Sequence, residues 1–362
     1  MSDTIATVPL FTGEGVARPE PELPEPLEPQ LRSRGRYIPG PGLQAAVEVA
    51  LMLGQPLLLT GEPGTGKTTM SRALAYERFG GRHLEMQVKS NSGRDDLLYR
   101  FDDIARFRDA QANRVRPLVE YLEIRPFGEA ILRACGPEAP LLDRAGRPLR
   151  GDEAFLEGAL GPRRPVGPPA ARLLLPDARD WSGPERWVVL IDEIDKAPRD
   201  TPNDLLEEFD RLAFAIPEMG LRVAPDGDRR QVRPVVVVTS NSEKSLPAAF
   251  LRRCAYHHIP FPSGPELRSV ISERLGNLTM GRRRLDELLE LFEALRPQLH
   301  QKPGTAELLQ WLKRADDDEE FAEASDRGTR AARLRLLIAI LAKDSRDQNT
   351  VGTRLDAWAR GS

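Results

Sequence analysis

The chain has little of what marks a secreted or membrane protein. Its 362 residues contain only two cysteines, Cys135 and Cys254, too few for a framework of disulfides. The longest apolar runs, such as residues 336–342, fall well short of the roughly 18 residues that a membrane-spanning helix requires. The N-terminus carries acidic residues and prolines where a signal peptide needs a basic start and an apolar block. We therefore expect a cytoplasmic protein with no membrane span.

An excess of charge of one sign is also missing. The formal net charge is −3 at pH 7, which gives the chain as a whole no strong attraction for nucleic acid or anionic lipid. The acidic run at 316–320 is interpreted as a solvated face rather than a binding site. Nucleic acid is therefore not an expected partner.

What is present divides the chain into regions. Residues 1–35 are rich in proline and glutamate and cannot bury enough apolar surface to offset chain entropy, which predicts a disordered tail. Residues 36–262 alternate apolar strand-like runs with helical spacing, which predicts a parallel α/β sheet. The expected strands lie at 57–60, 83–89, 187–191, 234–239 and 256–261.

Two further regions carry no strand alternation. Residues from about 105 to 185 are rich in arginine, glycine and proline, and we interpret them as an insertion that adds little to the core and contacts a partner. Residues 263–362 show helical spacing, which predicts a small helical lid domain. One of its expected helix faces consists of Leu285, Leu288, Leu289, Phe292 and Leu295.

The strongest motif follows the first expected strand. Residues 61–68, GEPGTGKT, match the pattern G-x-x-x-x-G-K-[ST] between a strand and a helix, which is typical of a phosphate-binding loop. Lys67 would reach the terminal phosphates of a nucleotide and Thr68 would offer a hydroxyl to Mg²⁺. The alternative, an incidental glycine-rich turn, is disfavoured by this strand-and-helix context. The predicted nucleotide-binding residues are Gly61, Glu62, Pro63, Gly64, Thr65, Gly66, Lys67, Thr68 and Thr69.

A pair of carboxylates ends a later strand. In VVLIDEIDK, residues 188–196, four apolar residues run directly into Asp192 and Glu193. Near a phosphate loop, such an aspartate helps to hold Mg²⁺ and the following glutamate can accept a proton from an attacking water. Alone, the pair could be an ordinary surface turn. Together with the loop, it favours hydrolysis over transfer to a substrate hydroxyl.

These motifs resemble a family. GEPGTGKT, VVLIDEID, VVVVTSN at 235–241 and LPAAFLRRC at 246–254 are similar to AAA+ ATPases. DDLLYRFDDIARFRDAQ at 95–111 resembles, more narrowly, the MoxR-type members. The resemblance covers roughly residues 36–262 and implies an ATPase that converts ATP and water to ADP and phosphate with Mg²⁺.

The resemblance also implies roles for single residues. Asn241 matches the polar sensor that hydrogen-bonds the attacking water or the γ-phosphate, although a turn residue or helix cap is an alternative. Arg253 matches the arginine finger given to a neighbouring subunit, with Arg252 as a rival; interface salt bridges formed by the two arginines are the alternative. Tyr37 and Ile38 match the segment lining the adenine pocket, with core packing as the alternative.

The match is incomplete in the C-terminal domain. The family's second sensor is often an arginine at a helix start after a proline, but residues 301–305, QKPGT, offer only Lys302 nearby. Lysine can supply the charge but lacks the two-pronged fork of arginine. The coupling of lid movement to the bound nucleotide is therefore left open at this position.

For the whole chain, the resemblance implies a homo-oligomeric ring, with a hexamer favoured. It further implies a chaperone-like remodeller or maturation factor that acts on a protein client or with a von Willebrand factor A domain protein. Two alternatives stay open: a McrB-like, nucleic-acid-directed NTPase motor, and a nucleotide-gated scaffold with little turnover. The near-neutral charge argues against the first alternative, and Glu193 with the arginine pair argues against the second.

Overall fold

The computed structural model describes residues 37–114, 116–149, 158–161, 169–178, 180–225, 232–276 and 278–361, so the expected tail at 1–35 lies outside the described residues. Contacts divide the chain into two compact units. Of the described residues, the sheet unit comprises those of Pro39–Gly61 and Lys67–Ile259, and the helical unit comprises Tyr37, Ile38, Glu62–Gly66 and those from Pro260 to Gly361. The domain boundaries expected after residues 35 and 262 stay predictions.

A five-stranded parallel sheet with the order β2-β5-β8-β1-β9 forms the centre of the sheet unit. Every residue of β1 and β8 is buried, as expected for strands covered on both faces. Strand β9 ends at His258 rather than at 261, because Pro260 has no amide hydrogen for the ladder. The strands are β1 Leu57–Thr60, β2 His83–Gln87, β5 Val188–Asp192, β8 Val235–Ser240 and β9 Ala255–His258.

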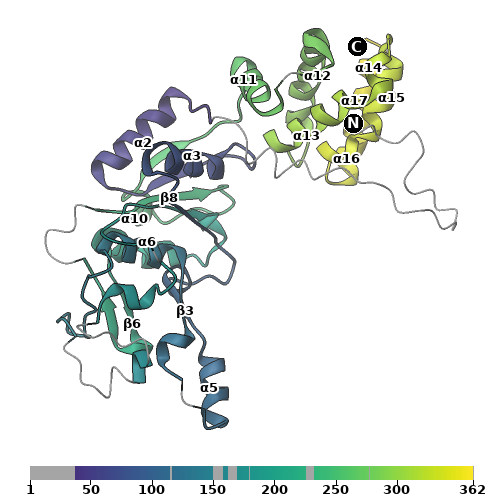
Figure 1. Cartoon of the computed structure of the whole chain (residues 1–362). Coiled ribbons are helices and arrows are strands. Elements are labelled where there is room, and N and C mark those ends of the chain that lie inside the picture. The colour runs from purple at the N-terminus through teal and green to yellow at the C-terminus, as the bar shows by residue number, and fades with distance from the viewer. Residues whose placement is uncertain are drawn as a thin grey trace. The chain divides into compact units, whose positions relative to one another are not determined.

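Helices cover both faces of this sheet. Figure 1 shows α2 (Pro41–Leu53) and α3 (Lys67–Phe79) on one side of the strands and α6 (Pro126–Cys135) on the other. Helix α6 packs closely on α4 (Asp95–Leu98) at Gly128. A Cβ at this position would lie 2.0 Å from the carbonyl oxygen of Leu98, so only glycine fits this contact. The expected parallel α/β sheet is confirmed.

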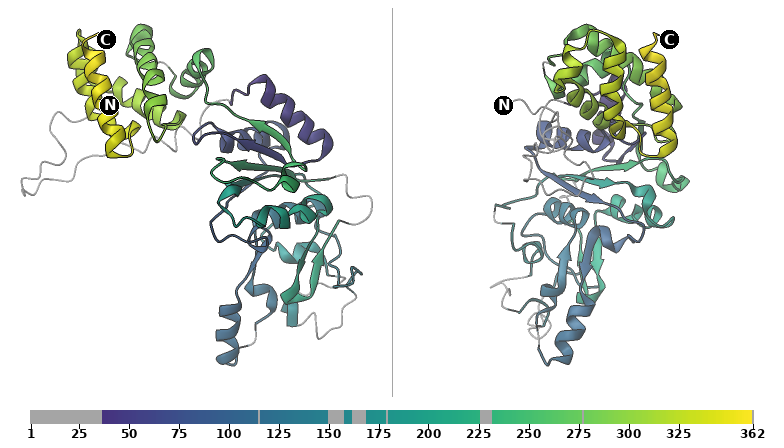
Figure 2. Two further views of the ribbon diagram at one scale, coloured as in Figure 1. Left: turned by 180° about the vertical axis from the view of Figure 1, so that it is seen from behind. Right: turned by 90° about the vertical axis from the view of Figure 1, so that its right-hand side faces the viewer.

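An arm extends from the sheet unit. It consists of the antiparallel strands β3 (Tyr99–Phe101) and β4 (Leu122–Ile124), helix α5 (Asp103–Gln111) and the short helix η1 (Leu118–Tyr121). Both views in Figure 2 place α5 at the far end of this arm. No residue of α5, all of which the structure describes, is buried.

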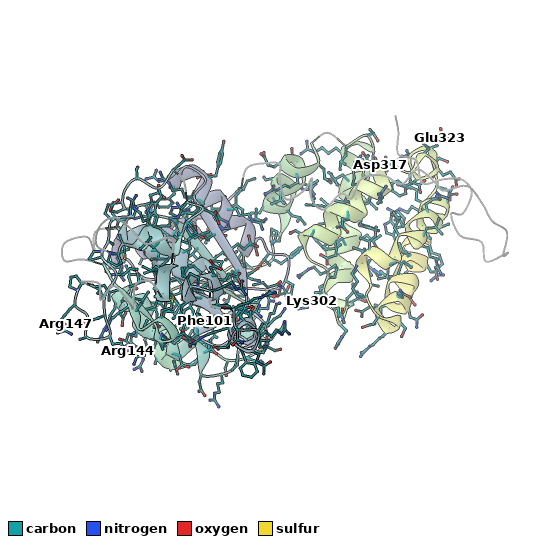
Figure 3. The ribbon with its side chains drawn as sticks, turned by 60° about the horizontal axis from the view of Figure 1, so that its bottom comes forward. Phe101, Arg144, Arg147, Lys302, Asp317 and Glu323 are labelled. Atoms are coloured by element: carbon teal, nitrogen blue, oxygen red, sulfur yellow. The ribbon has the colours of Figure 1, made fainter. Side chains whose placement is uncertain are left out.

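The interpretation of residues 105–185 as a region outside the core is wrong. Helix α6 lies within this region and buries seven of its ten residues. The short helix η3 (Ala171–Leu174) and Trp181 join the same apolar core as Val189 and Ile191 of β5. The apolar residues escaped notice because they stand among prolines, glycines and arginines. Only part of the region is polar surface, including Arg144 and Arg147, which lie at the rim of the sheet unit (Figure 3).

Smaller elements complete the sheet unit after β5. Strands β6 and β7 form an antiparallel hairpin. An antiparallel β-bridge between Arg222 of β7 and Leu142 joins this hairpin to the segment that contains Leu142. The elements are η4 Ile194–Lys196, α8 Thr201–Asp204, α9 Leu206–Arg211, β6 Phe214–Ile216, η5 Pro217–Met219, β7 Leu221–Val223 and α10 Ala248–Leu251.

The helical unit has its own apolar core. Leu288, Leu289, Phe292 and Leu295 of α12 are buried, and Leu285 packs against them half-buried, which matches the expected helix face. The acidic run at 316–320 is not wholly solvated, because Asp316 and Asp318 are buried. The helices are α11 Gly264–Leu275, α12 Gly281–Leu295, η7 Arg296–Gln298, α13 Thr305–Asp316, α14 Glu319–Glu323, α15 Arg327–Leu336, α16 Ile338–Leu341 and α17 Ser345–Ala359.

Within the described ranges, none of the helices has the length and apolar character needed to cross a membrane.

Candidate functional site

The phosphate loop joins β1 to α3. Gly61, Gly64 and Gly66 have φ angles of 147°, 76° and 89°, which side chains rarely tolerate, so the glycines of the motif permit this path. The Nζ of Lys67 donates to the carbonyl oxygen of Gly61 at 2.8 Å. Burial lowers the pKa of Lys67, while the carboxylate of Asp192 opposes this shift. The lysine is thus held at the loop beside acidic groups.

The two residues expected to hold Mg²⁺ are brought together. Thr68, in the first turn of α3, donates from Oγ1 to Oδ2 of Asp192 at 3.1 Å. The other oxygen of Asp192 accepts a hydrogen bond from Thr239 of β8. This hydroxyl of Thr239 in turn accepts the backbone N–H of Glu193 at 2.9 Å. The carboxyl end of β5 is therefore fixed by groups from α3 and β8.

Glu193 stands at the centre of a hydrogen-bond network. Its Oε1 accepts from Nδ2 of Asn241 at 3.2 Å, so the expected base and the expected sensor are neighbours. Its Oε2 accepts from Nε2 of Gln87 at 2.8 Å and from Nζ of Lys196 at 2.6 Å. Burial alone would raise the pKa of Glu193, but the donors Lys196, Gln87 and Asn241 outweigh it and lower the pKa.

The backbone at Glu193 is unusual. Its φ of 60° and ψ of 48° place it in the left-handed region, which is rare for a residue with a side chain and which clusters at functional sites. The sequence interpretation missed Gln87 and Lys196. Gln87 ends β2 directly opposite Asp192, and this pairing depends on which strands are neighbours.

The turns after β5 and β8 are also tied together. Asp195 is 3% exposed, and its Oδ2 accepts the backbone N–H of Glu243 at 3.0 Å. The Nζ of Lys244 lies 3.3 Å from the carbonyl oxygen of Lys196 and donates to it. These links hold Asn241 and Glu193 on adjoining segments.

The two candidate arginine fingers lie after α10. The Nε of Arg253 is 3.4 Å from Oδ2 of Asp210, and both side chains are about half exposed, at 47% and 58%. Arg252 is exposed. Among the residues that the structure describes, neither arginine bonds to Asp192 or Glu193. Within one chain these arginines are thus separate from the carboxylates.

Comparison with known protein families identifies the domain that contains this site. A family model described as the AAA domain of the dynein-related subfamily matches residues 56–254, which is more than half of the chain. The chain belongs to this AAA family. It therefore carries an AAA+ ATPase domain, and the match spans the phosphate loop, the carboxylate pair and both candidate arginines.

Comparisons with individual proteins add little to the family match. No curated protein matches the AAA chain. Two solved structures that match are NtrX from Brucella abortus in complex with ADP and with ATP, each 12% identical. The alignments cover 92% of this chain but only 53% and 56% of the NtrX chains, with TM-scores of 0.35 and 0.36.

Within the helical unit, the loop residue Glu62 has two cationic partners. Lys302, expected in place of the second-sensor arginine, lies with its Nζ 3.1 Å from Oε1 of Glu62. Arg296, which the sequence interpretation missed, pairs with Oε2 of the same carboxylate. The Arg296 guanidinium lies 3.6 Å above the ring centroid of Phe261 and donates to the carbonyl oxygen of Pro303 at 2.9 Å. The hydrogen bond from Arg296, followed by that from Lys302, keeps the pKa of Glu62 below its ordinary value.

The sequence interpretation missed Arg296 because this residue follows the end of a helix, whereas the second-sensor arginine of the family is expected at the start of a helix. It ends the apolar face of α12 and begins the short helix η7. Its side chain is 13% exposed, much less than the 45% of Lys302. The AAA chain thus holds a well-fixed guanidinium at the loop as well as a lysine.

Tyr37 and Ile38, the expected adenine-pocket residues, differ in their surroundings. The ring of Tyr37 lies against Gly66, where an added Cβ would be 3.3 Å from Cε2 of the tyrosine. Burial raises the pKa of Tyr37 to about 12, against a lowering effect of Arg274. Ile38 is 43% exposed, so it is not a core residue.

Proposed function

We propose that this AAA protein hydrolyses ATP to ADP and phosphate. The observation that carries the proposal is the hydrogen bond between Glu193 and Asn241, directly beside the Thr68–Asp192 pair. A glutamate that is ionised and hydrogen-bonded to a polar amide is suited to accept a proton from a water held between them. Lys67 would neutralise charge on the terminal phosphates at the other side of the loop.

A magnesium ion fits the residues present. Thr68 Oγ1 and Asp192 Oδ2 are hard oxygen donors 3.1 Å apart, and Mg²⁺ prefers one or two such groups with nucleotide phosphates and water completing its shell. When bound, Mg²⁺ would supply positive charge to the phosphate oxygens. Thr68 and Asp192 would hold it, and Thr239 would orient the Asp192 carboxylate.

The larger assembly rests on the resemblance to MoxR-type ATPases. We propose a homo-oligomeric ring, a hexamer by preference, in which Arg253 of one subunit serves the nucleotide of the next. The exposure of Arg253 and its separation from Glu193 within one chain support a role toward a neighbour. The ring would act in the cytoplasm as a chaperone-like remodeller or maturation factor on a protein client or with a von Willebrand factor A domain protein. A sequence of 362 residues with only two cysteines, Cys135 and Cys254, supports a reducing compartment.

The test separates binding from hydrolysis. Lys67→Ala removes the charge at the phosphates, and we expect it to abolish ATP binding. Glu193→Gln keeps the shape but removes the base, so ATP binding should persist while phosphate release falls by roughly 10²- to 10⁴-fold. Wild-type turnover by Glu193→Gln would refute the proposed role of this residue. Measuring GTP alongside ATP tests the McrB-like alternative, and a wild-type protein that binds ATP without releasing phosphate would indicate a scaffold.

A further inference from the structure

Lys196 ends the stretch VVLIDEIDK and contacts the carboxylate of Glu193, but no function has been assigned to it so far. It ends the short helix η4, three residues after Glu193, and its Nζ lies 2.6 Å from Oε2 of Glu193. Its side chain is 39% exposed, whereas that of Glu193 is 19% exposed. The ammonium group therefore reaches from the protein surface into the site.

The two oxygens of Glu193 are occupied differently. Oε2 accepts from both Lys196 and Gln87, whereas Oε1 accepts only from Asn241 among the residues that the structure describes. A carboxylate oxygen has about two positions for accepting hydrogen bonds. Oε2 is thus filled, and Oε1 keeps one position for a proton donor.

We propose that Lys196 is a positioning residue that selects which oxygen of Glu193 acts as the base. Lys196 and Gln87 anchor Oε2, and this turns Oε1 and the amide of Asn241 toward the same water. The inference rests on the proposed ATP hydrolysis with Glu193 as base. In that step Oε1 takes a proton from water, the water oxygen bonds to the γ-phosphorus, and the β–γ bridging P–O bond breaks with its electrons passing to ADP.

The surroundings of Lys196 suit this role better than a role in stability. A partly exposed ion pair three residues apart contributes little to folding. The backbone of Lys196 is fixed by Lys244, which donates to its carbonyl oxygen, and by the neighbouring contact between Asp195 and Glu243. A fixed backbone carrying a charged donor limits the directions open to the Glu193 side chain.

Kinetics of Lys196 variants test the proposal. We expect Lys196→Met to lower kcat by about 10- to 100-fold, because a misplaced catalytic group costs that much, with KM and Kd for ATP nearly unchanged. Lys196→Arg keeps the charge and should restore most of the rate. Lys343→Met is the control: this exposed lysine donates to the carbonyl oxygen of Ala339 in the helical unit, and the kcat of the variant should match the wild type.

A double variant separates positioning from general damage. In the Glu193→Gln background the base is already absent, so adding Lys196→Met should cause no further loss. Full activity of Lys196→Met would overturn the inference about Lys196 but not the proposed function. The same holds if Lys196→Met lowers the rate of Glu193→Gln by the same factor as that of the wild type and Lys196→Arg does not restore the rate. Wild-type turnover by the single variant Glu193→Gln would instead overturn the proposed function on which it rests.

Discussion

Both units contain carboxylates with limited exposure, but the hydrogen-bond partners of these groups differ. In the sheet unit, Asp192 and Glu193 bond to side chains that come from other strands and helices. In the helical unit, Asp316 accepts the backbone N–H groups of Thr279 and Met280 at 3.0 and 2.6 Å. Asp347 likewise accepts those of His300 and Gln301.

This difference separates two uses of the same kind of residue. A carboxylate that satisfies buried backbone amides holds chain segments in place, and its loss leaves those donors without a partner. A carboxylate surrounded by side chains at the ends of parallel strands can exchange partners when a ligand arrives. Substitutions in the helical unit should therefore change stability, whereas those at the strand ends should change the rate.

The largest expected effect tests how far the core of the sheet unit extends. Replacing residues 143–182 by a short Gly/Ser linker removes buried Leu160, Leu173, Leu174 and Trp181. Each large apolar side chain contributes roughly 1.5–3 kcal/mol when buried, so the loss approaches the whole stability of a typical domain. We expect the cooperative thermal transition of the sheet unit to disappear in circular dichroism.

The matched control for this replacement is α5. Substituting a Gly/Ser linker for Asp103–Gln111 removes no buried side chain and should leave a cooperative transition. Equal melting curves for the two variants would show that residues 143–182 contribute no more to folding than the arm does.

The second effect concerns rate without stability. An arginine that neutralises charge on the γ-phosphate from a neighbouring subunit is worth roughly 10³ to 10⁵ in rate, so Arg253→Ala should be nearly inactive while it binds ATP. Its melting temperature should be unchanged, because the pair with Asp210 is exposed. Activity is measured by phosphate release.

Mixed assemblies sharpen this prediction. Combining Arg253→Ala with Glu193→Gln creates some interfaces with an intact Glu193 and an intact Arg253, so part of the activity should return after subunit exchange. Arg252→Ala serves as the comparison variant. No recovery in assemblies shown to be mixed would count against a shared site, and loss of activity only in Arg252→Ala would transfer the role to that residue.

A smaller effect is expected for Asp316, and here stability should change without activity. Asp316→Ala leaves the N–H groups of Thr279 and Met280 without their acceptor, which should destabilise the helical unit by about 2–4 kcal/mol. Asp317→Ala is the control, since Asp317 (Figure 3) directly follows α13 and pairs with Lys313 in the last turn of that helix. Chemical denaturation measures both. Similar losses in the two variants would contradict the structural role of Asp316.

The smallest effect depends on pH. Burial alone would raise the pKa of Asp347, but the N–H donors of Gln301 and His300 lower it below its ordinary 3.8. A lowered pKa stabilises the folded state above the unfolded pKa, and this stabilisation is lost as pH falls through the folded value. Asp347→Asn should therefore cost about 1 kcal/mol at pH 7. The difference from wild type should shrink below pH of about 4.

Denaturation at pH 7 and at pH 3 measures this change, with the exposed Asp356→Asn as control. A difference between Asp347→Asn and wild type that stays the same at both pH values would show that the carboxylate charge is not involved.

Many residues at the carboxyl ends of the parallel strands could be predicted, because short motifs in the sequence mark them. Gly61 to Thr68 carries its glycines and lysine within one loop, and Asp192 with Glu193 directly follows a buried strand. The role of Asn241 as a sensor was implied by the family resemblance, and its hydrogen bond to Glu193 depends on β8 lying beside β5. The helical face of α12 was visible from spacing alone.

The remaining features depend on neighbours in space. Gln87 reaches Glu193 only because β2 lies beside β5, and Arg296 reaches Glu62 across a long stretch of sequence. The core residues of the region 105–185 are scattered among prolines, glycines and arginines, so no period marks them as buried. The local amino-acid sequence thus determined the phosphate loop, the strands and the carboxylate pair, because each is a short run of residues that specifies its own backbone conformation. The tertiary structure alone decided which side chains hold Glu193 in place, because strand order and close packing choose partners that no spacing in the sequence specifies.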